Sequence, residues 1–288
     1  MKLVSVAALI VLLAPSGWAQ LVIDRQLGDL VFIPKQVEEE KPAEPEKPSY
    51  SGDPITLPSE CRRPELARLG LACSEGAPCE LFLELIDVKP GGDDRIYLIG
   101  NLSTTSAGLA AIMLVSEDQG ASWSEAADRV GAGMFEKLSF LEYEFGWVAG
   151  QAAGESVPRA PFLLATDDGG KNWTRYSIWA GSEERSGSVL DVYFDGPDHG
   201  FLSIETRGSS GDPFELYETV TGGTSWSIRQ IASEPPKIRR SRRIEAAPTW
   251  RLGENPNDKA YEVLRLVDGA WVTAARFAVA LGPCEVVD

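Results

Sequence analysis

The sequence predicts an all-β fold, a β-propeller-like array of about four blades with four strands each. Three observations support this prediction. Short strand-like runs recur in stretches of about 50 residues, a turn rich in Gly and Asp separates the first two runs, and a longer turn ending in Trp follows the third. Many short strands at even spacing, with a turn repeated at a fixed place, are typical of propeller blades.

The strand-like runs form three clear units and a fourth, less regular one. In chain order the clear runs are 81–88, 95–100, 109–115, 136–143, 147–151, 161–165, 189–194, 201–206 and 214–218. We therefore expect blades at 79–130, 131–185, 186–235 and 244–288, the last built around a hairpin at 268–269. A short helix is expected at 64–70, before the first blade, because Pro64 suits a helix start and Gly70 a helix end.

The turn that ends in Trp occurs three times, as SEDQGASW at 116–123, TDDGGKNW at 166–173 and TVTGGTSW at 219–226. We call these segments the first, second and third tryptophan turns. Their tryptophans are 50 and 53 residues apart. A shorter fourth copy is expected at 268–271. Internal repeats of this length predict an array of similar structural units.

The residue types of the turns suit a structural role. Asp118 and Asp168 can accept hydrogen bonds from backbone amides two or three residues ahead, and Thr221 can supply a weaker hydroxyl version. Gly120 and Gly170 lie where the turn is expected to need positive φ. Each Trp ring is expected to be buried against neighbouring strands. A catalytic role for the two aspartates is the alternative, which we disfavour.

The pattern Ser/Thr-x-Asp-x-Gly-x-Ser/Thr-Trp resembles the Asp-box, or bacterial neuraminidase repeat, of sialidase-like β-propellers. The run GWVAG at 146–150 resembles repeats of the photosystem II stability/assembly factor family. The resemblance covers about 79–284 and implies that the tryptophan turns are peripheral and structural. The second tryptophan turn departs from the pattern at Asn172, and the third departs from it at Thr221. The residues that carry it are Ser116, Asp118, Gly120, Ser122, Trp123, Thr166, Asp168, Gly170, Trp173, Thr221, Gly223 and Trp226. A closed four-blade ring, an open arc and a ring completed by a second chain are all compatible with the sequence.

The N-terminal region predicts export. Residues 1–19 combine a positive start, an apolar run and small residues before Ala19, which is the layout of a cleaved signal peptide. A membrane anchor is the alternative, but the apolar run at 3–13 is too short to span a bilayer. Residues 20–33 are apolar enough for an edge strand, 34–58 form a linker rich in Pro, Glu and Lys, and 59–288 form the domain. We expect a periplasmic or secreted protein.

Four cysteines in an exported chain predict two disulfides, in any of three pairings. We expect one bridge to join the start of the domain to its end, and favour Cys61–Cys73 with Cys79–Cys284. A zinc site is the alternative, but the spacing lacks paired Cys-x₂-Cys units. No metal is therefore expected.

Catalytic chemistry finds little support. The chain has one histidine, His199, which lies in a turn and is expected to be exposed. The arginines Arg95, Arg159, Arg207 and Arg251 are scattered rather than spaced as the cluster of an active sialidase, and no pair of carboxylates stands out. We expect no catalytic residue and no cofactor. The net charge of −16 argues against a nucleic acid as partner.

One basic run interrupts this acidic sequence. It is a candidate docking patch for an acidic partner, or else a solvated loop, and its residues are Lys237, Arg239, Arg240, Arg242 and Arg243. The function we expect is a non-catalytic scaffold in the cell envelope that binds a protein or peptide and assists assembly. The alternative is a sialidase-like glycan-binding protein or glycoside hydrolase. No membrane span is expected after cleavage of the signal.

Overall fold

The computed structural model describes residues 22–23, 30–31, 50, 52–74, 76–153, 159–179, 186–207, 211–240 and 248–287. The predicted signal peptide and most of the predicted linker lie outside these ranges. No helix within them has the length and apolar character needed to span a bilayer. The chain divides into two units, Met1–Lys47 and Pro48–Asp288. In the first unit, β1 (Val22–Ile23) pairs antiparallel with β2 (Leu30–Val31).

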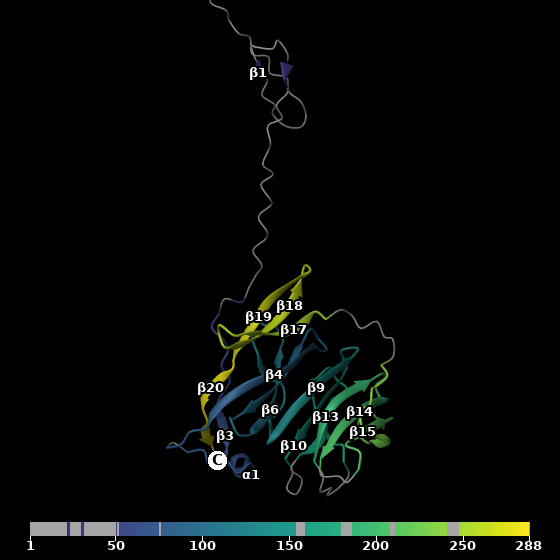
Figure 1. Cartoon of the computed structure of the whole chain (residues 1–288). Coiled ribbons are helices and arrows are strands. Elements are labelled where there is room, and N and C mark those ends of the chain that lie inside the picture. Colours follow the sequence, from purple (N-terminus) through teal and green to yellow (C-terminus); the bar gives the residue numbers. More distant parts are fainter. Residues whose placement is uncertain are drawn as a thin grey trace, which may run out of the picture. The chain divides into compact units, whose positions relative to one another are not determined.

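The second unit is all-β, as predicted, and its one helix among the described residues is the short α1 (Arg63–Arg68). Each of the three clear sequence units forms an antiparallel sheet with four strands in chain order (Figure 1), and the first of these sheets has six strands because two further short strands join it. The first sheet contains β4 (Glu80–Pro90), β5 (Ile96–Ser103), β6 (Gly108–Ser116) and β7 (Ser124–Glu125); β8 (Val130–Gly131) also pairs with β6. The second contains β9 (Gly133–Leu141), β10 (Phe145–Ala152), β11 (Ala160–Thr166) and β12 (Thr174–Ser177). The third contains β13 (Ser186–Phe194), β14 (Gly200–Arg207), β15 (Phe214–Thr219) and β16 (Ser227–Ala232).

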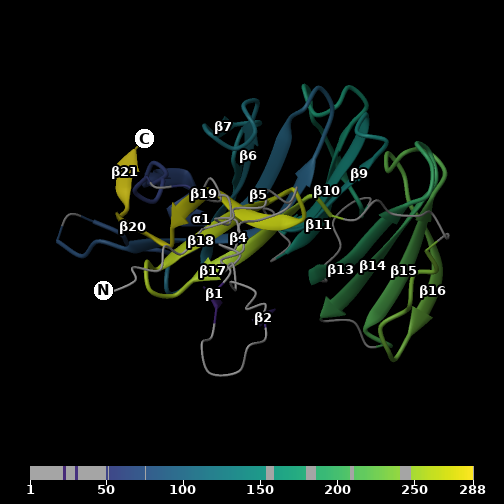
Figure 2. The ribbon, with the colours of Figure 1, turned by 90° about the horizontal axis from the view of Figure 1, so that it is seen from above.

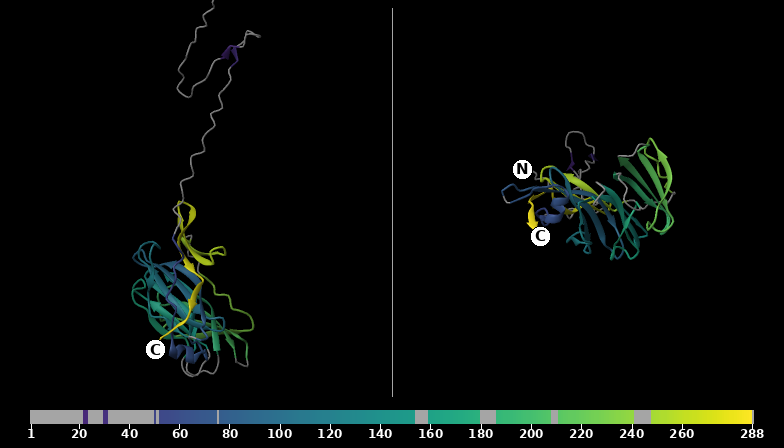
Figure 3. Two further views of the ribbon diagram at one scale, coloured as in Figure 1. Left: turned by 90° about the vertical axis from the view of Figure 1, so that its left-hand side faces the viewer. Right: turned by 90° about the horizontal axis from the view of Figure 1, so that it is seen from below.

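The fourth sheet has three strands, β17 (Trp250–Asn255), β18 (Ala260–Val267) and β19 (Ala270–Ala278). The chain then leaves this sheet, and β20 (Ala280–Pro283) pairs with β4 of the first sheet (Figure 3). The expected fourth tryptophan turn is therefore wrong. Asp268 and Gly269, with φ of +48° and +79°, form the short turn between β18 and β19, whereas the tryptophan turns connect the third strand of a sheet to the fourth.

The four sheets form a blade-like array, because their first strands pack on one another in the order β17, β4, β9 and β13. Figure 2 shows the sheets following one another in that order. A separate apolar core fills each space between neighbouring sheets. The core between the fourth and first sheets includes Leu83, Leu98, Val263 and Phe277. The core between the first and second sheets includes Tyr97, Ile99, Phe135 and Phe162. The core between the second and third sheets includes Trp147, Leu163, Phe194 and Ile204. Apolar residues on both faces explain the near-complete burial of β5 and β10, while the outer β16 is exposed.

The disulfides are Cys61–Cys284 and Cys73–Cys79, so the predicted pairing is wrong. The predicted link between the start and the end of the domain is confirmed, because β3 (Glu60–Arg62) pairs in parallel with β21 (Glu285–Val287) and places Cys61 beside Cys284. Cys79 also meets Cys284, but only through its backbone, where the Cys284 amide donates to the Cys79 carbonyl at 2.8 Å.

Candidate functional site

The first tryptophan turn satisfies its own polar groups. The Ser116 hydroxyl donates to Asp118 Oδ1 at 2.9 Å and accepts from the Gly120 amide at 2.8 Å. Asp118 Oδ1 also accepts from the Ser122 amide at 2.8 Å, and Asp118 Oδ2 accepts from the Ser122 hydroxyl at 2.5 Å. The Asp therefore bonds four residues ahead, further than predicted. The predicted positive φ is observed at Gly120 and Gly170, +93° and +89°.

The other two turns keep this network with different side chains. In the second turn Asp168 accepts from the Thr166 hydroxyl at 2.7 Å, the Asn172 amide at 3.0 Å and Asn172 Nδ2 at 2.7 Å. The side-chain amide of Asn172 thus replaces the hydroxyl donor that Ser122 supplies in the first turn. In the third turn, the Thr221 hydroxyl accepts from the Ser225 amide at 3.0 Å, which is the hydroxyl version expected for Thr221.

These bonds hold the two carboxylates in the charged form. Hydrogen bonds from the Ser122 hydroxyl, the Ser122 amide and the Ser116 hydroxyl lower the pKa of Asp118 to about 2. For Asp168, burial alone would raise the pKa, but the bonds from Asn172 and Thr166 outweigh it and lower the pKa to about 2. A carboxyl with so low a pKa is a poor general acid near neutral pH, which favours the structural role over the catalytic one.

Each turn also contacts the neighbouring sheet. The ring of Trp123 meets Phe277 of the fourth sheet edge-on at 5.7 Å, and Trp173 meets Tyr97 of the first sheet at 5.9 Å. Trp226 packs on Phe194, which stacks on Trp147 of the second sheet at 3.7 Å. The turns therefore lie at the contacts between sheets, where edge-on aromatic pairs are favourable.

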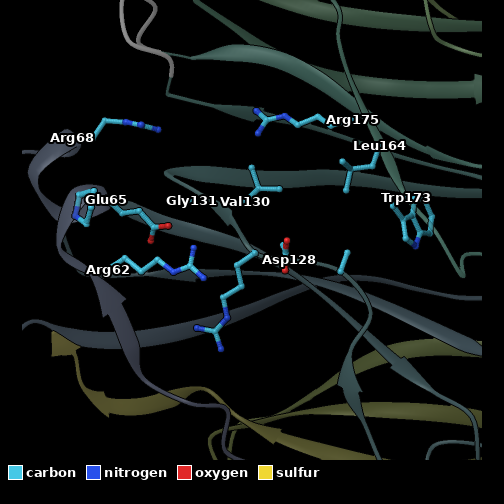
Figure 4. Close-up of a pocket in the computed structure, with 12 residues that line it drawn as sticks. Arg62, Glu65, Arg68, Asp128, Val130, Gly131, Leu164, Trp173 and Arg175 are labelled. Atoms are coloured by element: carbon cyan, nitrogen blue, oxygen red, sulfur yellow. The ribbon is translucent and has the colours of Figure 1, made fainter. Parts of the chain in front are cut away.

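Beside the second turn lies a cleft of about 540 Å³. We call it the arginine cleft. Its charged lining residues are Arg62, Glu65, Arg68, Asp128, Arg129 and Arg175, and Trp173 also borders it. Figure 4 shows Arg62 and Arg68 reaching into this space from the α1 side and Arg175 reaching in from the opposite side. In a chain of net charge −16, four guanidinium groups around one cleft form a local positive site.

Most of these arginines have no acidic partner among the residues that the structure describes. Arg129 donates to Glu125 Oε1 at 2.8 Å and to the Pro58 carbonyl at 3.5 Å. In contrast, Arg62, Arg68 and Arg175 form no ion pair with any residue that the structure describes. The guanidinium of Arg175 lies 4.3 Å from the centre of the Phe162 ring, and desolvation lowers the pKa of this arginine. A guanidinium group offers several N–H donors in one plane, so these four groups can bind an anion.

Local structure explains how the cleft forms. The pairing of β3 with β21 and the Cys61–Cys284 disulfide fix the backbone beside Arg62. Pro64 starts α1, which carries Glu65 and Arg68 along one wall. A Cβ at Gly131 would overlap the Glu65 side chain, so the glycine leaves room for that side chain beside the first sheet.

The sequence does not predict this cleft. Two of the scattered arginines that it does offer lie outside the cleft: Arg95 pairs with Glu117 at 2.8 Å, and Arg251 lies over the Trp271 ring at 4.3 Å. The gathering arginines come from β3, α1, the segment before β8, and β12. No spacing in the sequence links them, because these segments come together only in the folded chain.

The basic run is only partly described. Lys237 and Arg239 are exposed, and Arg242 and Arg243 lie outside the described residues. Arg240 donates to both carboxylate oxygens of Asp191, at 3.0 and 3.1 Å, so it is already engaged within the domain.

The single histidine is half-buried rather than exposed. His199 Nδ1 lies 2.6 Å from Asp195 Oδ1, and Nε2 lies 3.1 Å from Glu218 Oε1. Hydrogen bonds to Glu218 and then Asp195 raise the pKa of His199. Both ring nitrogens are thus occupied by structural contacts.

Comparison with known proteins gives no family. No family model and no curated protein matches the chain. Among solved structures, it is similar to an α-L-arabinofuranosidase from Fusarium graminearum, with 14% identity and a TM-score of 0.35 over 75% of this chain and 61% of the enzyme. It is also similar to an ulvan lyase of polysaccharide lyase family PL25, with 10% identity and a TM-score of 0.38 over 73% of this chain and 54% of the lyase. The chain thus spans less than two thirds of either structure, and no comparison confirms the Asp-box family.

Proposed function

We propose that the chain is an exported binding module and that the arginine cleft holds an anionic ligand. The observation that carries this proposal is the gathering of Arg62, Arg68 and Arg175 around one cleft without an acidic partner among the described residues. A guanidinium group binds carboxylate or sulfate through two parallel hydrogen bonds. The two disulfides suit a protein of an oxidising compartment outside the cytosol.

The ligand class that we favour is an acidic polysaccharide. The carboxylates Glu65 and Asp128 line the cleft together with its arginines. Carboxylates accept hydrogen bonds from hydroxyl groups, so a chain that alternates acid groups with sugar hydroxyls satisfies both kinds of lining residue. A ligand of dense negative charge, such as polyphosphate, would be repelled by the same two carboxylates.

A scaffold that binds an acidic protein segment is the second candidate. The observation in its favour is the exposed pair Lys237 and Arg239, which has no ion pair with any described residue. In this case the basic run, rather than the cleft, would contact the partner.

Calorimetric titration of the full chain with oligogalacturonate, at low and at high salt, tests the main proposal. We expect R62Q/R175Q to weaken binding at least tenfold and the matched charge-removal variant K237Q/R239Q to leave it within about twofold, since each charge-assisted hydrogen bond is worth about 1.5–3 kcal/mol. Equal weakening by both variants would mean that only net charge matters. Loss in K237Q/R239Q alone would transfer the site to the basic run, and absence of binding would remove the proposal.

A further inference from the structure

A second cavity, of about 460 Å³, is built from turns of the first and second sheets and from the start of β17 in the fourth sheet. We call it the turn cavity. It is lined by Asp93, Asp94 and Arg95 from the turn between β4 and β5, Gln119 from the first tryptophan turn, Tyr143 from the turn between β9 and β10, and Trp250 at the start of β17. It shares no lining residue with the arginine cleft.

Tyr143 is the unusual residue of this cavity. Its φ is +61°, in the left-handed region that favours glycine, and its side chain is 53% exposed, more than almost every other large apolar residue described. A bulky residue with positive φ is a genuine outlier. The turn is held there by close packing, because a Cβ at Gly92 would lie 3.0 Å from the Tyr143 carbonyl and 3.1 Å from Gly169 Cα. Glu142, Asp93 and Asp94 in the same and the adjacent turn also have positive φ, so this conformation belongs to the hairpin turns. What distinguishes Tyr143 is a large aromatic residue left exposed at the cavity.

The polar groups around the ring offer both donors and acceptors. Asp94 is exposed, has a φ of +59°, and makes no hydrogen bond or ion pair with a described residue. Gln119 accepts from Arg265 Nη1 at 3.2 Å through its side-chain oxygen, which leaves its amide NH₂ able to donate. Arg95 Nη1 is buried and has no hydrogen-bond partner among the described residues, although it lies 3.9 Å from Asp93 Oδ2 and Arg95 Nε binds Glu117 at 2.8 Å.

We propose that the turn cavity binds a neutral carbohydrate, with Tyr143 as the stacking platform and Asp94 and Gln119 as partners for its hydroxyl groups. A sugar ring has an apolar face that can cover the tyrosine and hydroxyls that both donate and accept. Asp93 and Asp94 disfavour an anion. Arg95 and Lys171, whose Nζ lies 2.6 Å from Asp93 Oδ2, disfavour a cation.

The test uses the full chain and four neutral hexasaccharides as probes: cellohexaose, xylohexaose, mannohexaose and maltohexaose. Binding is measured by calorimetry, and Tm by thermal denaturation. We expect at least one probe to bind, Y143F to retain its affinity, and Y143G and D94N each to weaken it at least tenfold. We also expect Y143G to have an unchanged or higher Tm, because glycine adopts positive φ without strain. The matched control is K259G, which replaces another exposed residue of positive φ, +48°, outside the cavity and should leave affinity unchanged.

Three results would overturn the proposal: no binding of any hexasaccharide, binding that survives Y143G, or a clearly lower Tm in Y143G, which would make Tyr143 a packing residue. The arginine cleft variant R62Q/R175Q should bind the neutral probe normally. Binding of the hexasaccharide without binding of the anionic ligand would support this proposal alone, and the reverse result would support the arginine cleft alone.

Discussion

The second tryptophan turn and the arginine cleft share Trp173 but use their charged groups in opposite ways. In the turn, the Asp168 carboxylate accepts three hydrogen bonds from two residues of the same short segment. In the cleft, Arg62, Arg68 and Arg175 have no acidic partner among the described residues. A charged group that is fully paired within a repeated motif stabilises the fold, whereas unpaired groups gathered from unrelated segments mark a place where a ligand can bind.

The largest expected effect on stability comes from the Cys61–Cys284 disulfide, next to Arg62 of the arginine cleft. The Cys61–Cys284 disulfide closes a loop of 223 residues, and chain-entropy arguments give a loop of that length about 5 kcal/mol of stability. We expect C61S/C284S to lose about this much in urea denaturation and to bind the anionic ligand more weakly, because Arg62 follows Cys61 directly. The matched variant C73S/C79S opens a loop of only 6 residues and should lose about 2 kcal/mol. Equal losses would show that the terminal link does not organise the domain.

The next effect tests whether the turns join neighbouring sheets. Gly170 has a φ of +89°, and a Cβ there would overlap the Tyr97 ring of the first sheet. We expect G170A to lose about 3 kcal/mol in urea denaturation, since left-handed backbone strain and overpacking each cost about 1–3 kcal/mol. Gly196 has no neighbouring atom within 4 Å of such a Cβ, so G196A is the matched control and should change stability little. A G170A protein as stable as G196A would contradict the role of the turn as a contact between sheets.

The sheets and their turns can be predicted from the sequence, but the contacts between the two ends of the domain cannot. Alternating apolar residues and the spacing of Trp123, Trp173 and Trp226 predict three sheets and their turns because strand and turn preferences act over a few residues. The departure of β20 to the first sheet and the parallel pairing of β3 with β21 depend on contacts between the two ends of the domain. For this reason the predicted fourth turn and the predicted disulfide pairing were wrong.

The candidate sites divide in the same way. The bonds of Asp118 and Asp168 lie within single turns and follow from the motif. The arginine cleft requires β3, α1, the segment before β8 and β12 to come together, and the turn cavity requires turns of the first and second sheets to meet the start of β17. Neither arrangement has a signature in residue spacing.

A smaller effect should appear in the pH dependence of stability. The pKa of Asp168 is about 2 in the folded chain, below its usual 3.8. A lowered pKa adds stability that is fully present above the unfolded value and is lost as the pH falls through the folded value. We therefore expect D168N to have a lower Tm than the wild type at pH 6, with the difference shrinking between about pH 4 and pH 2. A difference in Tm that stays constant over this range would show that the charge of Asp168 does not stabilise the turn.

The smallest expected effect on stability belongs to the cleft itself. Because Arg62 and Arg175 pair with no carboxylate among the described residues, replacing them breaks no ion pair. R175Q does remove the guanidinium from over the Phe162 ring, a contact worth about 0.5–1 kcal/mol. We expect R62Q/R175Q to lose no more than about 1 kcal/mol in urea denaturation while binding the anionic ligand at least tenfold more weakly. R129Q, which removes the bond to Glu125, serves as the comparison and should lose a similar amount. A marked loss of stability in R62Q/R175Q would place these arginines with the tryptophan turns, as groups that hold the fold together, and would remove the contrast on which the binding proposal depends.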